Sequence, residues 1–281
     1  MIKLGVIGYP LSHTLSPDMQ NAALRHLGIE GHYYKLETPP EDLVSQVKYL
    51  KVQDFRGFNV TIPLKVWITP LLNSVDDIAN IAGAVNTVII DEGKNLHGYN
   101  TDVYGFTQAI PANIRCNLKS KKAAVLGSGG AARAVAVGLA QMGVEKITFY
   151  SRNERKATSL KDALAGNFPE TTIEIKEFNE FADLSYASIL VNSTPVGMQG
   201  NNQDISPITK KSIESLPNDA LVYDLVYRPQ ETRLQFYAKN RGLATINGVE
   251  MLVLQGAKSL SLWINQDAPV DIMRQAVLEN L

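Results

Sequence analysis

The stretch that decides the fold reads Lys122-Ala123-Ala124-Val125-Leu126-Gly127-Ser128-Gly129-Gly130-Ala131-Ala132. It opens with an apolar run typical of a buried strand, and the amphipathic segment 133–142 after it is typical of a helix. The glycines fit the pattern G-x-G-x-x-A, in which Gly127 permits a tight turn and Gly129 lets backbone approach a pyrophosphate. Free N–H groups at the start of the helix favour the phosphates. The segment therefore predicts a dinucleotide site, and a glycine-rich turn without a ligand is the alternative. The residues predicted to form this site are Gly127, Ser128, Gly129, Gly130 and Ala131.

The end of the next predicted strand, 146–150, indicates which dinucleotide is bound. NAD sites usually place an acidic residue there to bond the ribose hydroxyls. This chain instead has Ser151, Arg152 and Asn153, with Lys156 one helical turn further on. A guanidinium and an ammonium suit a 2′-phosphate, so the strand end favours NADP. The alternative is that Arg152, Arg155 and Lys156 form the solvated start of a helix.

The same alternation of short apolar runs and longer amphipathic segments continues in both directions from this motif. Strands are predicted at 4–7, 58–62, 85–90, 96–99, 122–126, 146–150, 172–175, 188–191, 220–224 and 244–246. Helices are predicted at 17–27, 40–50, 133–142, 154–164, 232–240, 249–264 and 270–278. Strands that alternate with helices predict an α/β fold with a mostly parallel sheet.

We expect two domains. Residues 1–102 would form an N-terminal α/β substrate domain with a mostly parallel sheet and one antiparallel element. Residues 103–248 would form a Rossmann-type doubly wound NADP-binding domain. Residues 249–281 would form C-terminal helices that return to pack on the first domain.

Composition excludes several other classes of protein. The 281 residues carry 27 Lys and Arg against 28 Asp and Glu, which gives no electrostatic basis for binding nucleic acid or an anionic membrane. The single cysteine, Cys116, excludes a disulfide within the chain. No His, Asp or Glu cluster has the spacing of metal ligands, so we expect no metal. No apolar run approaches the ~20 residues of a membrane span, and the first residues lack a signal-peptide pattern. We expect a cytoplasmic protein.

Two charged residues in the N-terminal half are placed to meet in a ligand crevice. Lys65 follows a predicted strand and the turn at Pro63, and Asp102 ends another extended segment. The carboxyl ends of neighbouring strands line the crevice where α/β sheets bind ligands. An ammonium beside a carboxylate can transfer a proton there. Taken singly, each residue also fits a surface or helix-capping role.

A set of motifs across nearly the whole chain resembles the shikimate dehydrogenase family. These motifs follow the family's order and are Gly8-x-Pro10-x-x-His13-Thr14-x-Ser16-Pro17, Asn59-Val60-Thr61-Ile62-Pro63-x-Lys65, Gly83-Ala84-Val85-Asn86-Thr87, Gly98-x-Asn100-Thr101-Asp102-x-x-Gly105, Gly127-Ser128-Gly129-Gly130-Ala131, Asn192-Ser193-Thr194-Pro195-x-Gly197-Met198 and Gln255-Gly256-Ala257. Because the case rests on the whole ordered set, it does not depend on any one motif.

The resemblance implies NADPH-dependent, reversible reduction of 3-dehydroshikimate to shikimate in aromatic amino-acid biosynthesis. By position, Lys65 and Asp102 match the family's catalytic pair. The residues that match its substrate site are Thr14 and Ser16 for the carboxylate, Thr61, Asn86 and Gln255 for the ring hydroxyls and ketone, and Tyr227 near the carboxylate. Those that match its cofactor site are Arg152 for NADP recognition, Thr194, Val196 and Val226 in loops facing the cofactor, and Gly248 and Met251 at the nicotinamide end.

Two positions depart from the family pattern. Ser151-Arg152-Asn153 stands where Asn-Arg-Thr is usual, and Thr14 stands where serine is usual. Threonine keeps the hydroxyl but adds a methyl group, which narrows the pocket near the carboxylate, where quinate has an extra hydroxyl.

The alternatives are therefore a quinate or dual quinate/shikimate dehydrogenase, a ligand-binding regulator without chemistry, and a folate-type methylene dehydrogenase. A regulator would be expected to lack Lys65 or Asp102, and the folate enzyme would lack the loop of Thr14 and Ser16. We expect a small-molecule substrate and a monomer or homodimer.

Overall fold

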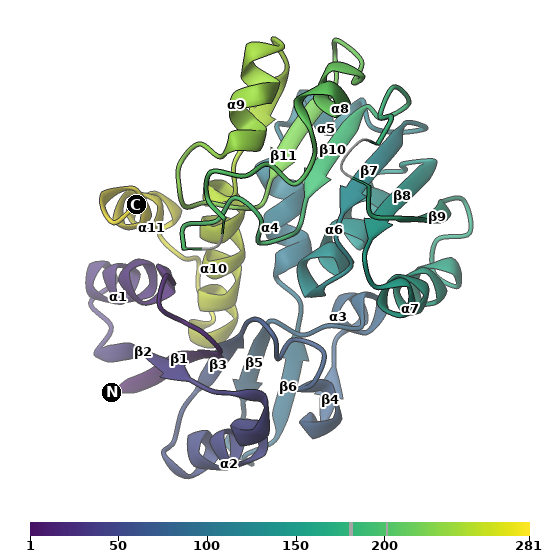
Figure 1. The fold of residues 1–281 in the computed structure, drawn as a ribbon. Helices are drawn as coiled ribbons and strands as arrows, with labels where there is room; N and C mark the ends of the chain where they lie inside the picture. Colours follow the sequence, from purple (N-terminus) through teal and green to yellow (C-terminus); the bar gives the residue numbers. More distant parts are fainter. Residues whose placement is uncertain (180–181, 201) are drawn as a thin grey trace. The chain divides into compact units, whose positions relative to one another are not determined.

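The computed structural model describes residues 1–179, 182–200 and 202–281. The chain divides into two compact units. Unit 1 comprises Met1–Gly105 and Leu252–Asn280, and unit 2 comprises Phe106–Met251 with Leu281. Each unit is built around its own sheet (Figure 1).

The sheet of unit 1 has six strands in the order β2-β1-β3-β5-β6-β4. Its strands are β1 (Ile2–Gly8), β2 (Gly31–Glu37), β3 (Gly57–Val60), β4 (Ser74–Val75), β5 (Thr87–Ile90) and β6 (Leu96–Tyr99). Strand β5 runs antiparallel to both of its neighbours, while the β1–β2, β1–β3 and β4–β6 pairs are parallel. The expected mostly parallel sheet with one antiparallel element is confirmed.

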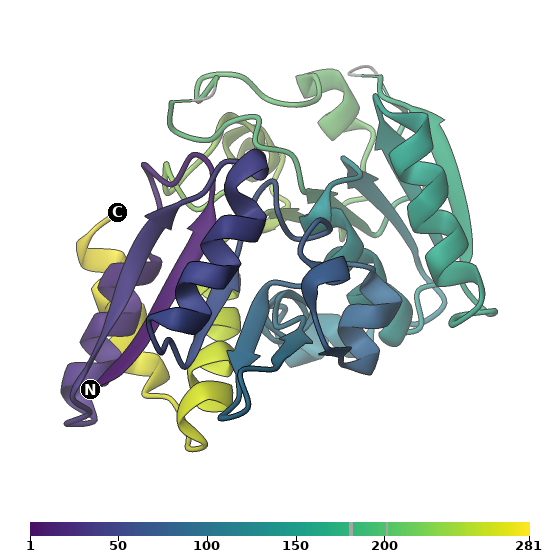
Figure 2. The ribbon, with the colours of Figure 1, turned by 90° about the horizontal axis from the view of Figure 1, so that it is seen from below.

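The helices of unit 1 include the C-terminal pair. They are α1 (Ser16–His26), η1 (Pro40–Asp42), α2 (Leu43–Val52), η2 (Thr69–Leu71), α3 (Asp77–Ala82), α4 (Asp102–Ala109), α10 (Val249–Ile264) and α11 (Val270–Glu279), with α4 and α10 each crossing a unit boundary. Helix α11 packs beside α1, as Figure 2 shows for the yellow and purple helices. The predicted helix 40–50 is divided, because Asp42, with φ −94° and ψ −1°, ends the 3₁₀ turn before α2 begins.

Helix α10 is anchored to the sheet of unit 1 by a buried tryptophan. Trp263 is 1% exposed, and its Nε1 donates to the carbonyl of Val88 at 3.0 Å. A Cβ at Gly57 would lie only 2.2 Å from that Nε1, so this position of β3 requires glycine. Gln20 of α1 also donates to the carbonyl of Gly256 in α10. The expected return of the C-terminal helices to the first domain agrees with these contacts.

The sheet of unit 2 has six strands in the order β12-β11-β10-β7-β8-β9, and every pair is parallel. Its strands are β7 (Lys122–Leu126), β8 (Lys146–Ser151), β9 (Thr172–Glu177), β10 (Ile189–Asn192), β11 (Leu221–Asp224) and β12 (Ala244–Ile246). Counted from β7, this is the 3-2-1-4-5-6 order of the doubly wound dinucleotide fold. The predicted Rossmann-type sheet is confirmed.

The helices of unit 2 are α5 (Ala112–Cys116), α6 (Gly130–Gln141), α7 (Glu154–Ala165), α8 (Lys210–Glu214) and α9 (Arg233–Asn240). Helix α6 is buried along almost its whole length, from Ala132 to Ala140. Gly138 lets α6 lie close to Phe106, because a Cβ at this position would come within 2.8 Å of the Phe106 ring. In the described ranges, no helix is long and apolar enough to span a membrane.

Candidate active site

Lys65 and Asp102 form a direct ion pair in unit 1. Lys65 lies in the turn after β3, and Asp102 is the first residue of α4, after β6. Lys65 Nζ lies 2.5 Å from Asp102 Oδ2, and the two side chains are only 14% and 6% exposed. Asn100 Oδ1 accepts from the backbone N–H of Val103 at the start of α4, so Asn100 rather than Asp102 supplies this capping hydrogen bond. The structure thus brings the predicted pair together, away from most of the solvent.

Asn86 connects this pair to helix α10. Its Nδ2 donates to Asp102 Oδ1 at 2.9 Å and to Gln255 Oε1 at 3.2 Å. Its Oδ1 accepts from the backbone N–H of Thr101 at 2.7 Å. In the described part of the chain, the two carboxylate oxygens of Asp102 therefore have different partners: Oδ2 faces Lys65 and Oδ1 faces Asn86. Of the predicted ring-binding residues, Asn86 contacts Asp102, and Gln255 contacts Asn86.

Thr61 stands at the same end of the sheet. Its backbone N–H donates to the carbonyl of Ile7, which sets the end of β3 against the end of β1. A Cβ at Gly8 would lie 2.4 Å from Thr61 Cγ2, so glycine allows the two strand ends to approach. Thr61 is half-buried at the start of the turn that carries Lys65.

Thr14 and Ser16 lie at the junction of β1 and α1. The Thr14 hydroxyl donates to Ser16 Oγ at 3.3 Å and accepts from the Ser16 N–H at 3.3 Å. Helix α1 begins at Ser16, its N-cap is Leu15, and no side-chain hydrogen bond caps it. Ser16 followed by Pro17 is a sequence pattern typical of a helix N-cap, but Ser16 does not cap α1. The two hydroxyls lie next to each other at the start of α1, an arrangement suited to a carboxylate.

The glycine-rich junction between β7 and α6 has room for a phosphate. Gly127 has φ +101°, and a Cβ there would meet Ser193 Oγ at 2.9 Å. A Cβ at Gly129 would meet no atom within 4 Å. Helix α6 begins at Gly130 without a side-chain cap. An open cradle over uncapped N–H groups fits the pyrophosphate of a dinucleotide. Ala131 follows as a half-buried residue of the first turn.

The end of β8 presents one guanidinium and one occupied hydroxyl. Ser151 is buried, and its Oγ lies 2.7 Å from the hydroxyl of Ser128 and accepts from the N–H of Asn153. Ser128 and Ser151 therefore tie the glycine-rich turn to the end of β8. Arg152 is exposed directly beyond them. Lys156 lies in α7, but its side chain falls outside the described part of the structure.

A buried cluster that sequence reasoning did not single out shapes the loop after β10. Asn192 Oδ1 accepts from the N–H and the hydroxyl of Thr194, and Asn192 Nδ2 donates to Asp224 Oδ1 at 2.9 Å. Asp224 also accepts from the Thr232 hydroxyl at 2.6 Å and from the Val226 N–H at 3.1 Å. Burial raises the pKa of the Asp224 carboxyl to about 6 despite these donors. The sequence signal was a polar residue at the end of each of two apolar strands.

The remaining predicted cofactor residues also lie in unit 2. The N–H of Val196 donates to Thr194 Oγ1 at 3.3 Å. The N–H of Gly248 donates to the carbonyl of Val226, and a Cβ at Gly248 would lie 2.0 Å from the carbonyl oxygen of Leu225, so only glycine fits there. Met251 is buried at the start of α10. Tyr227, predicted near the substrate carboxylate, is half-buried after β11.

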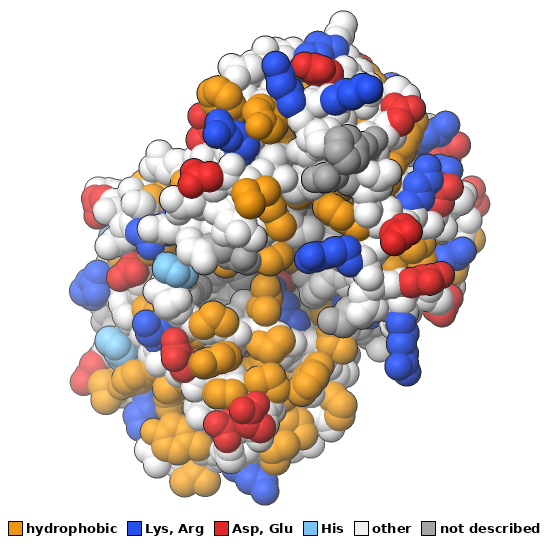
Figure 3. Space-filling view, in the orientation of Figure 1, with side chains coloured by type: hydrophobic (Ala, Val, Ile, Leu, Met, Phe, Trp, Pro, Cys, Tyr) orange, Lys and Arg blue, Asp and Glu red, His pale blue; other side chains and the backbone are white. Residues whose placement is uncertain are grey.

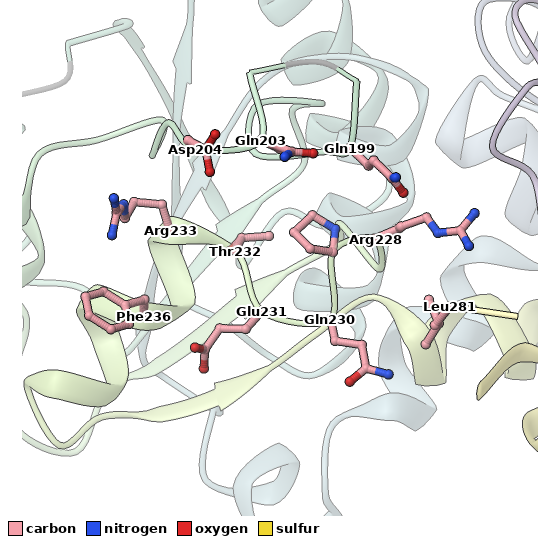
Figure 4. A pocket seen from close by; sticks show the side chains of 11 residues that line it. Gln199, Gln203, Asp204, Arg228, Gln230, Glu231, Thr232, Arg233, Phe236 and Leu281 are labelled. Atoms are coloured by element: carbon pink, nitrogen blue, oxygen red, sulfur yellow. The ribbon is translucent and has the colours of Figure 1, made fainter. Parts of the chain in front are cut away.

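A separate hollow of about 620 Å³ lies on unit 2 between the segment after Met198 and the start of α9 (Figure 4). Arg228 and Gln199 lie at one end, and Arg233 and Phe236 lie at the other. None of the described residues that line it is a predicted cofactor residue. This hollow is therefore distinct from the glycine-rich cradle.

Exposed hydrophobic side chains gather on unit 1, and Figure 3 shows an apolar surface at the end that carries α2. The exposed large hydrophobic residues described in this unit are Met1, Tyr9, Val44, Tyr49, Val52, Ile62, Val66, Trp67, Tyr104 and Leu278. Ile62, Val66 and Trp67 flank Lys65 along the chain.

Among the residues described, no group of three His, Cys, Asp or Glu side chains could hold a metal ion.

Comparison with known proteins places this geometry in a family. Residues 6–88 match the shikimate dehydrogenase substrate binding domain, residues 110–213 match shikimate/quinate 5-dehydrogenase, and residues 248–278 match the shikimate 5′-dehydrogenase C-terminal domain. Shikimate dehydrogenase (NADP(+)) of Synechocystis is 40% identical over 99% of this chain and 95% of its own length.

Solved structures agree with this assignment. Shikimate 5-dehydrogenase of Thermus thermophilus, solved with NADP(H) and shikimate, is 36% identical, covers 100% of both chains and has a TM-score of 0.86. Quinate dehydrogenase of Corynebacterium glutamicum, solved with NAD, is 29% identical over 99% of both chains, with a TM-score of 0.88. By its full-length identity to these proteins, the chain belongs to the shikimate dehydrogenase family.

Proposed function

We propose that the chain is an NADP-dependent shikimate dehydrogenase that reversibly reduces 3-dehydroshikimate to shikimate, a step of aromatic amino-acid biosynthesis. The observation that carries the proposal is the Lys65–Asp102 pair, 2.5 Å apart and largely buried, in a chain of this family. Relatives named for NADP and shikimate support the choice of cofactor and substrate.

NADPH supplies the hydride when bound, and the protein supplies the proton and the orientation of the substrate. In the direction of reduction, the ammonium of Lys65 gives its proton to the ketone oxygen as the carbonyl carbon accepts hydride, which yields the alcohol. Asp102 holds the ammonium in place through Oδ2. In the reverse direction, the Lys65–Asp102 pair takes the hydroxyl proton, and a role of Asp102 as the general base is the alternative within the same pair.

Polar residues around the pair would select the substrate. We assign Thr14 and Ser16 to its carboxylate, with Tyr227 nearby, and Thr61, Asn86 and Gln255 to its ring hydroxyls and ketone. An unmatched buried hydroxyl costs about 1–3 kcal/mol, so these partners would discriminate against analogues that lack a hydroxyl. Asn86 and Gln255 are already oriented around Asp102 by their mutual hydrogen bond.

The cofactor would occupy the glycine-rich cradle of the second domain. We assign its phosphates to Gly127, Ser128, Gly129, Gly130 and Ala131, and its 2′-phosphate to Arg152, with Ser151, Asn153 and Lys156 alongside. We assign its nicotinamide end to Thr194, Val196, Val226, Gly248 and Met251. We retain residues 1–102 as the substrate domain, 103–248 as the NADP domain and 249–281 as the returning helices.

Quinate is the second candidate substrate, because threonine rather than serine stands at position 14. Thr14 stands at the proposed carboxylate site, where a methyl group changes the space beside the carbon that bears the extra hydroxyl of quinate. The likeness to a quinate dehydrogenase solved with NAD supports testing it. Arg152 at the end of β8, where an acidic residue would suit NAD, favours NADP.

The deciding experiment follows the absorbance of reduced nicotinamide with shikimate and quinate, each with NADP and with NAD. Rapid reduction of NADP by shikimate alone supports the proposal. Comparable turnover of quinate assigns a dual enzyme and makes Thr14→Ser the next variant. No reduction in any of the four mixtures overturns the enzymatic assignment in favour of a ligand-binding regulator.

Two further expectations remain proposals. The chain would act in the cytoplasm as a monomer or a homodimer. Fractionation and the mass of the purified protein in solution test them.

A further inference from the structure

Three buried hydroxyls lie behind Asn86 and Asp102 in unit 1. Thr87 is the first residue of β5, Thr101 precedes α4, and Ser259 lies in α10. Their oxygens are separated by 2.8 Å (Thr87–Ser259), 3.0 Å (Thr101–Ser259) and 3.3 Å (Thr87–Thr101). None is more than 3% exposed. We call these three residues the hydroxyl cluster, and it joins the start of β5, the residue before α4 and the interior of α10.

The orientation of the Asn86 amide is fixed by partners that can act in only one way. A carboxylate only accepts, so the group that faces Asp102 Oδ1 is the Asn86 amino group. A backbone N–H only donates, so the group that faces Thr101 N is the Asn86 oxygen. The Thr87 and Thr101 hydroxyls lie 3.1 and 3.2 Å from that oxygen, and Thr101 Oγ1 accepts from the Asn86 amino group at 2.8 Å. The hydroxyl cluster thus contacts both ends of the Asn86 amide.

Ser259 connects the hydroxyl cluster to helix α10. Its hydroxyl donates to the carbonyl of Gln255, one turn earlier, at 2.9 Å. With its only proton used there, the Ser259 oxygen acts as an acceptor, with Asn59 Nδ2 at 3.0 Å and the hydroxyls of Thr87 and Thr101 at 2.8 and 3.0 Å. Each threonine hydroxyl has one proton, so it donates either to Ser259 or to the Asn86 oxygen. Gln255 itself meets Asn86 through its side chain. Ser259 therefore fixes α10 at the point where α10 reaches the catalytic pair.

A buried tyrosine sets the direction of the outer hydrogen bonds. The Tyr33 hydroxyl donates to Asn59 Oδ1 at 2.7 Å, which turns Asn59 Nδ2 toward the carbonyl of Asn86 and the hydroxyl cluster. Burial raises the pKa of the Tyr33 phenol well above its ordinary value, so the phenol keeps its proton and remains a donor. The hydrogen bonds consequently have one consistent direction from Tyr33 through Asn59 to the cluster.

We propose that Ser259 is a positioning residue for proton transfer: through the hydroxyl cluster it holds Asn86, and through Asn86 it holds the Asp102 carboxylate against Lys65. The inference rests on the proposed function. Among the described residues, Asp102 Oδ1 is bonded to Asn86 and Oδ2 to Lys65, so loss of the Asn86 contact frees the carboxylate to rotate and loosens Lys65. Small displacements of a proton donor lower the rate of the chemical step more than they weaken ligand binding.

The test compares Ser259→Ala with Ser261→Ala. Ser261 lies in the same helix, and its Oγ accepts from the Ala268 N–H outside the cluster. We expect Ser259→Ala to lower kcat roughly 10- to 100-fold, with KM for shikimate and for NADP nearly unchanged. We expect Ser261→Ala to retain the wild-type kcat. Unchanged kcat in a folded Ser259→Ala protein, or an equal fall in both variants, overturns the inference.

Thr87→Val provides a second, nearly isosteric route to the same result. It removes one hydroxyl of the cluster without leaving a cavity, so it serves if Ser259→Ala does not fold. We expect the same fall in kcat at unchanged KM, and wild-type kcat in this variant overturns the inference.

Crystal structures of the wild type and of Ser259→Ala separate this inference from the proposed function. A wild type inactive with shikimate overturns the function. An Asp102 carboxylate that keeps both its Asn86 and Lys65 contacts in Ser259→Ala overturns the positioning role, whatever the activity. We expect the variant to show the carboxylate turned away from Asn86.

Discussion

The first strand of each unit leads into a helix without a side-chain cap, yet the two junctions present different chemical groups to a ligand. Between β1 and α1, the longer junction carries the hydroxyl of Thr14 and ends at Ser16. Between β7 and α6, the short junction offers glycine backbone and the open space above Gly129, because the hydroxyl of Ser128 is bonded to Ser151. We infer that the junction of unit 1 binds its ligand through side chains and the junction of unit 2 binds its ligand through backbone.

The largest expected effect tests the chemistry assigned to unit 1. Lys65→Ala removes the proton donor, and general acid–base groups contribute about 10²–10⁴-fold to rate. We expect kcat to fall within that range, while KM for shikimate changes much less. Steady-state kinetics in both directions measure this.

Lys94→Ala is the matched control, because Lys94 is also paired with a carboxylate, that of Asp54, but lies on the surface. It should leave kcat unchanged. A Lys65→Ala protein that kept most of its kcat would remove Lys65 from the mechanism.

The next effect tests how unit 2 distinguishes NADP from NAD. Arg152→Ser removes the exposed guanidinium at the end of β8. Hydrogen bonds to charged groups contribute about 1.5–3 kcal/mol, so KM for NADP should rise roughly 10- to 100-fold while KM for NAD stays constant. Arg155→Ser, at the second residue of α7 and also exposed, is the control. Equal effects of the two substitutions on KM for NADP would favour the alternative that Arg152 and Arg155 are only solvated residues at the start of a helix.

The third prediction contrasts the two buried carboxylates at strand ends. Asp102 faces the ammonium of Lys65, whereas Asp224 has hydrogen bonds from Asn192, Thr232 and the Val226 N–H. Burial raises the pKa of Asp224 from 3.8 to about 6, so between these values the folded state binds more protons than the unfolded state. The free energy of unfolding attributable to Asp224 therefore falls as pH rises from about 4 to about 6.

Asp224→Asn should abolish that dependence. The difference in unfolding free energy between wild type and variant should shrink by about 2–3 kcal/mol from pH 4 to pH 7. Urea unfolding at four pH values measures this, with Asp219→Asn, an exposed site, as the control. Parallel pH curves for wild type and Asp224→Asn would contradict the assignment.

The smallest effect separates two glycines of one turn. Gly127→Ala forces a side chain into φ +101° and against Ser193, and should cost about 1–2 kcal/mol of stability. Gly129→Ala meets only open space, so it should leave Tm unchanged and raise KM for NADP several-fold. Thermal unfolding and NADP titration together distinguish them. A Gly129→Ala protein with unaltered NADP binding would mean that the cradle does not hold the phosphates.

Elements with a strong local pattern were predictable from the sequence. The glycine motif between a strand and a helix located β7 and α6, and alternating segments located β6, β12 and α10 at their observed bounds. Strand β2 and helix α3 were missed. Residues 31–37 mix buried and exposed polar side chains without a clean apolar run, and α3 has only six residues, too few for a helical period.

The candidate site was predictable only in part. Resemblance supplied the roles of Lys65 and Asp102, but by local pattern each fitted a surface or capping position. Their contact joins residues 37 apart in the sequence, and the Thr87–Ser259 contact joins residues 172 apart. Asn59, Thr87, Asp224 and Ser259 carried no signal of their partners, because a polar residue beside an apolar run does not say which distant hydroxyl or carboxylate it meets.

The sequence by itself determined the alternation of strands and helices, the glycine turn and the cation that replaces an acid after β8, since these depend on side chains close together in the chain. The tertiary structure decided the order of the strands, the burial of the Lys65–Asp102 pair and the hydroxyl cluster behind it. Those features depend on hydrogen bonds between β5, α4 and α10, which exist only once the sheet is assembled and water is excluded from it.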